Sequence, residues 1–429
     1  MLRTIGGAIV CAAMTVALSA QVTKTIVTFN ETNGDDMFSA MIQGADGNLY
    51  GTTTYGGASD KGTFFRISRQ GGEQVLYSFC AQPNCTDGAY PEFLIQGADG
   101  NFYGETYNGG STGAGSIFKM TAGGEVTTIY NFCTQTSCTD GALPQSALVQ
   151  TRDGSFYGTT VIGGSQNEGT VFKLSPNGTL TTLYNFCSLA SCADGTQPNI
   201  GLTLASDGNF YGTAALGGKT NAQLCGEYGC GTLFRITPSG AYTLLYSFCS
   251  QSSCADGDIP QGQLLQAKDG SLYGTTDGGG ANNGGAAFKI TPQGKVVTLH
   301  SFCTGTCQDG LIPYAGLIQA SDGNFYGTDT LGGPGGYGTV YQMTPGGKVT
   351  AVFGFDNGAD GGFPVAAVLQ ASDGRLYGGT EQGGADGFGV VFQVSGKATS
   401  FGESVLDAAT LDRLKAQARI PASPLRNER

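Results

Sequence analysis

The sequence lacks tryptophan, has a single histidine and is poor in charge. Charged residues make up 13% of its 429 residues, and His300 is the one histidine. Any Ser-His-Asp or Cys-His mechanism would have to use His300, so the composition argues against nucleophilic catalysis of that kind. The absence of tryptophan weakens a platform for stacking sugars, although tyrosine and phenylalanine can replace it.

Basic residues are also scarce, with 21 Lys and Arg against 33 Asp and Glu, which gives a formal net charge of −12. A nucleic-acid backbone or an anionic membrane needs a lysine or arginine for each neutralised phosphate, so neither is expected as a partner. Glycine, by contrast, contributes 73 residues, and apolar residues recur in every part of the chain. This mixture predicts an all-β protein with many tight turns, and neither collagen-like structure nor disorder.

The first 20 residues have the pattern of a secretory signal peptide. Arg3 precedes an apolar stretch from Ile5 to Leu18, and small residues follow up to Ala20. A membrane anchor is the alternative, but the apolar stretch is shorter than the ~20 residues that span a bilayer. We therefore expect a secreted protein, extracellular or periplasmic, that loses Cys11 with residues 1–20.

The other cysteines form close pairs along the chain, which indicates disulfides made in an oxidising compartment. The pairs are Cys80/Cys85, Cys133/Cys138, Cys187/Cys192, Cys225/Cys230, Cys249/Cys254 and Cys303/Cys307. Zinc is the competing interpretation, but the pairs lie far apart and one histidine is present, so we expect no metal. Each bridge closes a small loop and should mainly rigidify it.

A repeated string organises the chain. Asp-Gly-x-(Phe/Leu)-Tyr-Gly begins at Asp46, Asp99, Asp153, Asp207, Asp269, Asp322 and Asp373, at spacings of 53, 54, 54, 62, 53 and 51 residues. The long interval contains an insertion at residues 219–229, and the extra pair has Cys225 within it and Cys230 directly after it. The Tyr-Gly pair occurs in every copy, which is typical of a scaffold role, with the glycine allowing close backbone approach and the tyrosine packing between units.

Each copy is interpreted as four short strands, beginning with a segment such as residues 181–186 and continuing through residues 147–150, 156–160 and 169–174 or their equivalents. Such a unit cannot bury both faces alone, so seven copies predict a seven-bladed β-propeller of four-stranded antiparallel blades over residues 21–402. A β-solenoid is the alternative. Residues 26–29 and 398–401 both match the first strand, so one end should complete the blade begun by the other. A short helix and polar tail are expected at residues 403–429.

The units are similar to the GloVer tandem repeat of choice-of-anchor extracellular bacterial proteins, as in residues 320–328 (ASDGNFYGT) followed by 338–345 (GTVYQMTP). The Asp-Gly-Asn-Phe-Tyr segment more loosely resembles the hairpin of NHL-type propeller repeats. The resemblance covers roughly residues 24–401 and implies a surface or secreted location, with no assigned reaction or cofactor. The chain departs from the family name, since no sorting signal or transmembrane anchor follows the repeats.

A second recurring element, Asp-Gly-x-x-Pro, follows the cysteine pairs. Its aspartates are Asp87, Asp140, Asp194, Asp256 and Asp309, with Asp360 in a copy that lacks cysteines. The element is foremost a turn device, because the carboxylate can accept hydrogen bonds from its own backbone. The functional interpretation is a ring of carboxylates that holds Ca²⁺ or a cationic ligand, although the spacing matches no known calcium loop. His300 occupies the position of Tyr77, Tyr130, Tyr184 and Tyr246, and is interpreted as a tyrosine substitute.

Four acidic residues break the repeat near the Tyr-Gly pair: Glu105, Asp277, Asp329 and Glu381. If these strand ends point toward the mouth of the central channel, the four acids could line a pocket, and paired carboxylates could serve glycoside chemistry. Solvated surface acids are the plainer interpretation. The near-identical copies favour a non-enzymatic, monomeric propeller that binds a protein, a glycan or an ion. An extracellular carbohydrate-active hydrolase or lyase is the alternative, and a purely architectural spacer is a third.

Overall fold

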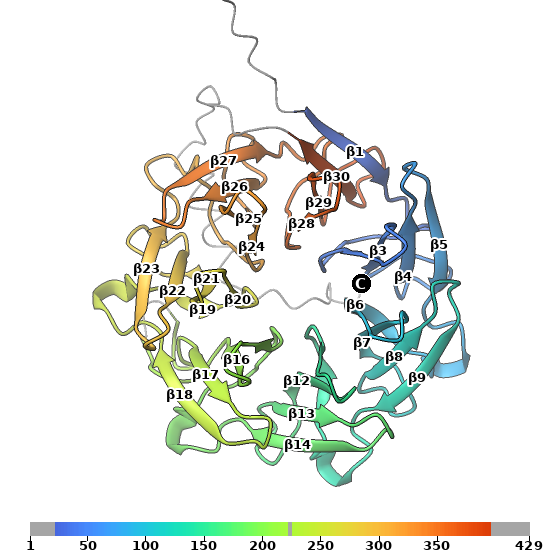
Figure 1. Cartoon of the computed structure of the whole chain (residues 1–429), viewed down its shortest axis with the longest axis horizontal. Helices are drawn as coiled ribbons and strands as arrows, with labels where there is room; N and C mark the ends of the chain where they lie inside the picture. Colours follow the sequence, from blue (N-terminus) through green and yellow to red (C-terminus); the bar gives the residue numbers. More distant parts are fainter. Residues whose placement is uncertain (1–21, 222–224, 396–429) are drawn as a thin grey trace, which may run out of the picture.

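The computed structural model describes residues 22–221 and 225–395. In this part of the chain the strands form seven antiparallel sheets, arranged as blades around a central axis (Figure 1). The predicted seven-bladed β-propeller is thereby confirmed. The predicted signal peptide (residues 1–20) and the predicted helix and tail (residues 403–429) lie outside the described residues. Within the described residues, no helix is long and apolar enough to cross a membrane.

Each blade has four strands, which lie side by side in order from the channel to the rim. The strands nearest the channel are β2 (Ile42–Gln43), β6 (Ala89–Gln96), β11 (Val149–Gln150), β15 (Thr203–Leu204), β20 (Leu265–Gln266), β24 (Ile318–Gln319) and β28 (Leu369–Gln370). The second strands are β3 (Leu49–Thr53), β7 (Phe102–Asn108), β12 (Phe156–Ile162), β16 (Phe210–Ala214), β21 (Leu272–Gly278), β25 (Phe325–Asp329) and β29 (Leu376–Gly379).

The third strands are β4 (Thr63–Ile67), β8 (Ser116–Met120), β13 (Thr170–Leu174), β17 (Thr232–Ile236), β22 (Ala286–Ile290), β26 (Thr339–Met343) and β30 (Val390–Ser395). The outermost are β5 (Glu73–Ser78), β9 (Val126–Asn131), β14 (Leu180–Asn185), β18 (Tyr242–Ser247), β23 (Val296–Ser301), β27 (Val349–Gly354) and β1 (Val22–Thr28). Short strands β10 (Ala142–Pro144) and β19 (Asp258–Pro260) also pair with β12 and β21. Blades are numbered 1 to 7 in the order of their inner strands.

The first strand of each sequence copy belongs to the preceding blade, which corrects the predicted strand frame. Residues 181–186 largely form β14, and β14 pairs with β13, the strand that comes before it in the chain. A blade therefore takes its inner three strands from one copy and its outermost strand from the next. The two frames differ by a cyclic shift, which a periodic sequence cannot distinguish.

The ring closes through its two chain ends. Strand β1 pairs with β30 in antiparallel register, with Lys24 opposite Gln393, and becomes the outermost strand of blade 7 (Figure 1). The expectation that one end segment completes the blade of the other is confirmed. The second candidate segment, residues 398–401, lies outside the described residues.

The hydrophobic core lies between neighbouring blades. The ring of Tyr103 in blade 2 lies 4.5 Å from that of Phe156 in blade 3, and equivalent pairs recur around the propeller. The glycine that follows this tyrosine leaves room for a ring of the adjacent strand, because a Cβ at Gly104 would lie 2.6 Å from Phe118. The repeated Tyr-Gly pair therefore serves packing, as its presence in every copy predicted.

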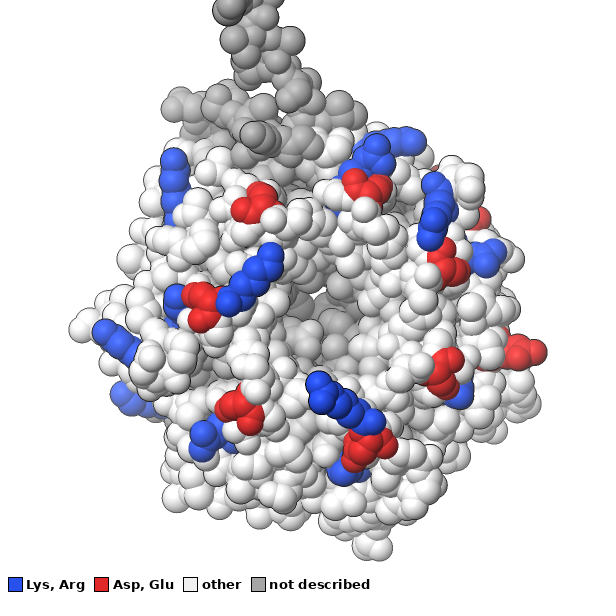
Figure 2. Space-filling view, in the orientation of Figure 1, with Lys and Arg blue, Asp and Glu red and all other residues white. Residues whose placement is uncertain are grey.

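Antiparallel topology places the inner-strand hairpins at one end of the channel and the cysteine loops at the other. The hairpin turns use glycines at positive φ, such as Gly154 at 81°. The aspartate of each turn accepts hydrogen bonds from other residues of the repeat. For example, Tyr103 Oη and Lys119 Nζ donate to Asp99 Oδ2 at 2.9 and 2.8 Å. Figure 2 shows acidic and basic side chains next to one another around the central hollow.

Glutamine side chains join the blades at this hairpin end. Six junctions repeat one bond, in which the inner-strand glutamine of one blade accepts from a backbone N–H of the preceding blade. The pairs are Gln96 with Ala45, Gln150 with Ala98, Gln266 with Ser206, Gln319 with Lys268, Gln370 with Ser321 and Gln43 with Ser372, each at 2.8 or 2.9 Å. We call this set the glutamine belt. In blade 4 the position is Leu204, so the belt lacks this bond at the junction of blades 3 and 4.

Candidate functional site

All the predicted disulfides are present in the part of the chain that the structure describes. They join Cys80 to Cys85, Cys133 to Cys138, Cys187 to Cys192, Cys225 to Cys230, Cys249 to Cys254 and Cys303 to Cys307. In four of the loops the second cysteine ends a short 3₁₀ turn: η1 (Pro83–Cys85), η2 (Thr136–Cys138), η3 (Ala190–Cys192) and η4 (Ser252–Cys254). The pairing predicted from the spacing is therefore confirmed.

The second cysteine of these loops has a role that the sequence analysis did not predict. The backbone of Cys85, Cys192 and Cys307 is left-handed, with φ of 52°, 50° and 56°. The carbonyl oxygen of Cys85 accepts from the N–H groups of Gly88 and Gly110, both at 2.9 Å. Cys192 and Cys307 accept two equivalent bonds each. Each disulfide loop is thus tied to the Gly-Gly loop that follows the second strand.

The expectation that a bridge mainly rigidifies its own loop stays a prediction. The backbone of the bridged cysteine also anchors a second loop. Cys307 also packs against apolar side chains. It is fully buried in a hydrophobic cluster with Leu311 and Leu331, and it lies four residues from Cys303 where the other pairs are five apart. Cys85 and Cys192 are half-buried. In the sixth copy the disulfide therefore also contributes to a local core.

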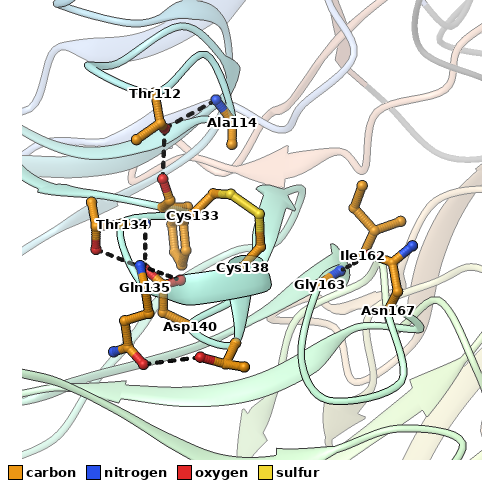
Figure 3. Close-up of a disulfide and its surroundings, with 12 residues drawn as sticks. Thr112, Ala114, Cys133, Thr134, Gln135, Cys138, Asp140, Ile162, Gly163 and Asn167 are labelled. Atoms are coloured by element: carbon orange, nitrogen blue, oxygen red, sulfur yellow. Dashed lines mark hydrogen bonds between the residues drawn. A yellow bond between two sulfur atoms is a disulfide. The ribbon is translucent and has the colours of Figure 1, made fainter.

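The aspartates of Asp-Gly-x-x-Pro hold the loops that these disulfides close. In the loop of Cys133 and Cys138, the carboxylate of Asp140 accepts from the backbone N–H groups of Thr134 and Gln135 at 3.0 and 3.3 Å (Figure 3). The hydroxyl of the tyrosine on β9, at 2.8 Å, completes the set. Asp140 is fully buried, and its oxygens are occupied by its own loop.

The same arrangement recurs in the other disulfide loops, at Asp87, Asp194, Asp256 and Asp309. His300 takes the tyrosine place beside Asp309, with Nε2 at 2.9 Å from Oδ2, as the sequence indicated. The geometry favours the turn role of these aspartates, and their binding of Ca²⁺ or a cationic ligand stays a prediction.

Asp360 differs because its loop has no disulfide. Its carboxyl group lies beside that of Asp356, and burial together with this neighbour raises the pKa of Asp360 to about 6. The Asp356 carboxylate also accepts from Gly358 N at 2.8 Å. Asp356 thus stands at the position of the first cysteine, next to the aspartate of the repeat.

The insertion in the fourth copy places its disulfide against the disulfide of the following loop. The sulfur atoms of Cys225, Cys230 and Cys249 lie within 4.8 Å of one another. All three are already bonded in disulfides, Cys225 with Cys230 and Cys249 with Cys254. This sulfur cluster therefore packs two loops together in the oxidised protein.

A cavity of about 660 Å³ occupies the central channel. Most of its wall comes from the inner strands. Each inner strand has a residue, aliphatic in most blades, at the same position of the repeat. Of these residues, the cavity is lined by Val149, Thr203, Leu265, Ile318 and Leu369. The equivalents in blades 1 and 2 are Ile42 and Ile95. The volume lies within the range of small-molecule sites, which are typically apolar with a few polar groups.

At the loop end of the propeller, one position of the repeat holds a residue that differs from blade to blade. Each follows the proline of Asp-Gly-x-x-Pro, or Met37 in the first copy. We name them the loop-end ring: Phe38, Glu92, Gln145, Asn199, Gln261, Tyr314 and Val365. Phe38, Gln261, Tyr314 and Val365 line the cavity directly.

The loop-end ring has a polar half and an apolar half. Blades 2 to 5 supply the polar residues, joined in pairs where Gln145 Nε2 donates to Glu92 Oε1 at 3.3 Å and Asn199 Nδ2 donates to Gln261 Oε1 at 3.0 Å. Blades 6, 7 and 1 supply Tyr, Val and Phe. The rings of Phe38 and Tyr314 lie 5.6 Å apart, edge to face, although they come from blades 1 and 6.

Two acceptor atoms of the polar half have no hydrogen-bond partner. These are Glu92 Oε2 and Asn199 Oδ1, and both atoms are buried. Burial raises the pKa of Glu92 to about 8, and the hydrogen bond from Gln145 offsets this only in part. Burial and then the charges of Asp277 and Glu92 raise the pKa of Tyr314 well above its usual value, so its phenol stays neutral.

The four acids predicted near the channel mouth lie in different settings. Glu105 is on β7 and reaches blade 3, where Ser146 N donates to Oε2 at 2.9 Å. Burial raises the pKa values of Glu105, Asp277 and Asp329 well above the usual range, and the charges that add to it come from Glu92, Asp258 and Asp309 respectively. Glu381 acts on Tyr314 through its charge. Their catalytic role stays a prediction.

The loop-end ring, including Glu92, was not predicted from the repeat. The signal was present in the sequence, because the residue after the repeated proline changes in nearly every copy while the proline itself persists. Glu105 was identified because it replaces a threonine of the repeat. Glu92 follows Pro91 in a copy that is one residue shorter at this point, which hid the equivalence.

Solved structures with the same fold include a streptogramin B lyase, which is 14% identical with a TM-score of 0.57 and 87% of this chain and 97% of that chain covered. Virginiamycin B lyase from Staphylococcus aureus is 13% identical, with a TM-score of 0.55 and coverage of 88% and 99%. At these identities the likeness concerns the fold alone. A comparison with curated proteins found no match.

The repeat itself identifies the family. The Gloeobacter/Verrucomicrobia repeat matches residues 7–225 and 221–409, which together span most of the sequence. This agrees with the resemblance drawn from residues 320–328 and 338–345. The chain therefore belongs to the Gloeobacter/Verrucomicrobia repeat family.

Proposed function

We propose that this protein is a secreted, non-enzymatic propeller that binds a small cyclic ligand rich in hydroxyl groups, such as a sugar residue, at the loop-end ring. The observation that carries the proposal is the division of this ring into a polar and an aromatic half. A sugar ring has hydroxyl donors at its edge and an apolar C–H face, so it matches both halves.

The chemistry of the polar half supports a ligand with hydrogen-bond donors. Glu92 Oε2 and Asn199 Oδ1 are buried acceptors without a partner, and a buried polar group left unpaired costs about 1 to 3 kcal/mol. A ligand hydroxyl at each atom would remove this cost. Phe38 and Tyr314 would cover the apolar face of the same ligand from the opposite side of the ring.

Export is part of the proposal. The disulfides in small loops require an oxidising compartment, and residues 1–20 have the pattern of a signal peptide. The proposed sugar ligand would then belong to the periplasm or the surroundings of the cell.

The hydrolase or lyase alternative has weaker geometric support. Glycoside hydrolysis needs two carboxyl groups that flank one bond. Glu105 lies on β7 of blade 2 and Asp277 on β21 of blade 5. The charge that adds to the raised pKa comes from Glu92 for Glu105 and from Asp258 for Asp277. The binding proposal uses a ring of residues of which Phe38, Gln261 and Tyr314 line one cavity.

Calorimetric titration of the chain with a panel of mono- and disaccharides tests the proposal. At least one should bind saturably, and Tyr314→Ala should weaken it by about tenfold or more, which corresponds to about 1.4 kcal/mol. Tyr228→Ala is the matched control, because Tyr228 is 73% exposed in the insertion, away from the ring. Absence of saturable binding at millimolar sugar, or equal affinity for both variants, would contradict the proposal.

A further inference from the structure

Two buried glutamates accept hydrogen bonds from adjacent residues of blade 3, at the junction of blades 2 and 3. Glu92 is 1% exposed and Glu105 is 0% exposed. Gln145 Nε2 donates to Glu92 Oε1 at 3.3 Å, and Ser146 N and Oγ donate to Glu105 Oε2 at 2.9 and 3.3 Å. The second oxygen of each carboxyl group, Glu92 Oε2 and Glu105 Oε1, is buried without a hydrogen-bond partner.

The repeat shows what this junction needs for folding alone. At the position of Glu105 most copies have threonine: Thr52, Thr159, Thr213, Thr275 and Thr328. Where its bond is defined, the hydroxyl donates to a carbonyl of the next inner strand, as Thr275 to Ala315 O at 3.1 Å and Thr328 to Ala366 O at 3.0 Å. A threonine therefore suits the scaffold in blades 1, 5 and 6, and a buried carboxyl group adds a desolvation cost that packing does not require.

Protein cations do not neutralise this pair. None of the ion pairs formed within residues 22–221 and 225–395 involves Glu92 or Glu105. The charge of Glu92 acts on Glu105 and raises its pKa further, after burial, so the two carboxyl groups lie within electrostatic range. Two buried carboxyl groups in this position must take up either protons or a cation from solution.

We propose that Glu92 and Glu105 bind a divalent cation that prefers oxygen ligands, with Ca²⁺ as the best match, between blades 2 and 3. Ca²⁺ takes carboxylate, carbonyl and water oxygens in flexible geometry, and each glutamate presents one oxygen that the protein leaves unpaired. The site differs from the aspartates of the disulfide loops, whose oxygens are occupied by backbone N–H groups. The site shares Glu92 Oε2 with the proposed sugar site, but it adds Glu105 from the junction of blades 2 and 3 and needs no sugar.

The experiment uses Ca²⁺ alone. The chain is stripped with a chelator and titrated with CaCl₂ without sugar, by calorimetry and by thermal unfolding. The wild type should bind Ca²⁺ saturably and unfold at a higher temperature when Ca²⁺ is present. Glu105→Thr, which installs the residue of the other copies, should abolish both effects while the chain still folds, and Glu92→Gln should weaken binding by about tenfold or more.

Asp329→Thr is the matched control. It also restores a threonine of the repeat at a fully buried acid, but in blade 6. The Ca²⁺ response of this variant should equal that of the wild type. The proposal is overturned if the wild type shows no Ca²⁺-dependent shift, which would leave protons as the neutralising charge. Retention of the full response in Glu105→Thr would also overturn it, because the ion would then lie elsewhere.

Discussion

The two ends of the central channel are built from the same repeat but differ in how strictly they keep it. At the hairpin end, nearly every blade presents the same Asp, Tyr and Gln, and the glutamine belt joins the blades with one repeated bond. At the loop end, the residue after the repeated proline changes from Phe to Glu, Gln, Asn, Tyr or Val. Positions that repeat in every blade therefore have structural roles, and positions that vary form the candidate functional site.

The energetic character of the two ends differs in the same way. The hairpin end shares many modest hydrogen bonds among equivalent junctions, as expected for a repeat protein whose stability is a sum of neighbour contacts. The loop end concentrates unpaired buried oxygens at Glu92, Glu105 and Asn199. Such groups lower stability unless a ligand or ion satisfies them, which is common at functional sites.

The largest expected effect concerns the repeated part of the loop end, which should behave as scaffold. Asp140→Ala removes the carboxylate that accepts from Thr134, Gln135 and Tyr130, and leaves these donors beneath a disulfide loop. The free energy of unfolding should fall by about 3 kcal/mol, since hydrogen bonds to a charged group are involved. Urea unfolding monitored by circular dichroism measures this loss.

Asp140→Asn provides the control, because its amide keeps one acceptor oxygen and should lose less stability than the alanine variant. An Asp140→Ala chain as stable as the wild type would break the comparison. It would mean that repetition on this face does not report structural need.

A second prediction concerns the variable part of the same end and its pH dependence. The pKa of Glu92 rises from 4.5 to about 8 on folding. The folded state therefore holds the proton more tightly, so this group's contribution is fully present below pH 4.5 and is lost as the pH rises through about 8. With chelator present, Glu92→Gln should unfold at a higher temperature than the wild type at alkaline pH.

The difference between Glu92→Gln and wild type should shrink toward acid pH, because both side chains are then neutral. Thermal unfolding as a function of pH gives the two curves. Curves that stay parallel from pH 4 to about pH 9 would show that Glu92 carries no buried charge.

Much of the fold followed from the repeat. Its Asp-Gly turns and four-strand unit predicted the propeller, and the match between residues 26–29 and the first strand predicted the closure. The strand frame did not follow, because every cyclic shift of a periodic sequence gives the same pattern. The pairing of β1 with β30 decides the strand frame, and this contact joins residues that lie at opposite ends of the propeller sequence.

The cysteine loops show the same division between what spacing reveals and what it hides. The spacing of Cys80 and Cys85 was enough to predict their bridge. It could not predict that the Cys85 carbonyl accepts from Gly110, because that bond depends on the return of the second strand to the loop end. Local pairs can be derived from sequence distance, whereas contacts between loops need the assembled blade.

The candidate site could be predicted from the sequence only in part. Glu105 could be identified as a break in the repeat, but its direction could not, since a side chain at the end of a second strand can face the channel or the next blade. Hydrogen bonds to Ser146 place it between blades. Tyr314 and Phe38 lie in different blades and meet only because the ring brings their inner strands together.

The smallest expected effect tests the hairpin end at its one irregular junction. Leu204 stands where the other blades have glutamine, and it is 39% exposed, so its side chain contributes little burial. Leu204→Gln should add the missing bond between blades 3 and 4 and raise the free energy of unfolding by about 0.5 to 1 kcal/mol. Gln150→Leu, the reverse change at the neighbouring junction, should lower it by a similar amount in the same urea titration. Suppose that Gln150→Leu lowers the free energy of unfolding but Leu204→Gln does not raise it. The spacing of blades 3 and 4, rather than the side chain, would then decide whether the bond forms, and the glutamine belt would depend first on blade geometry.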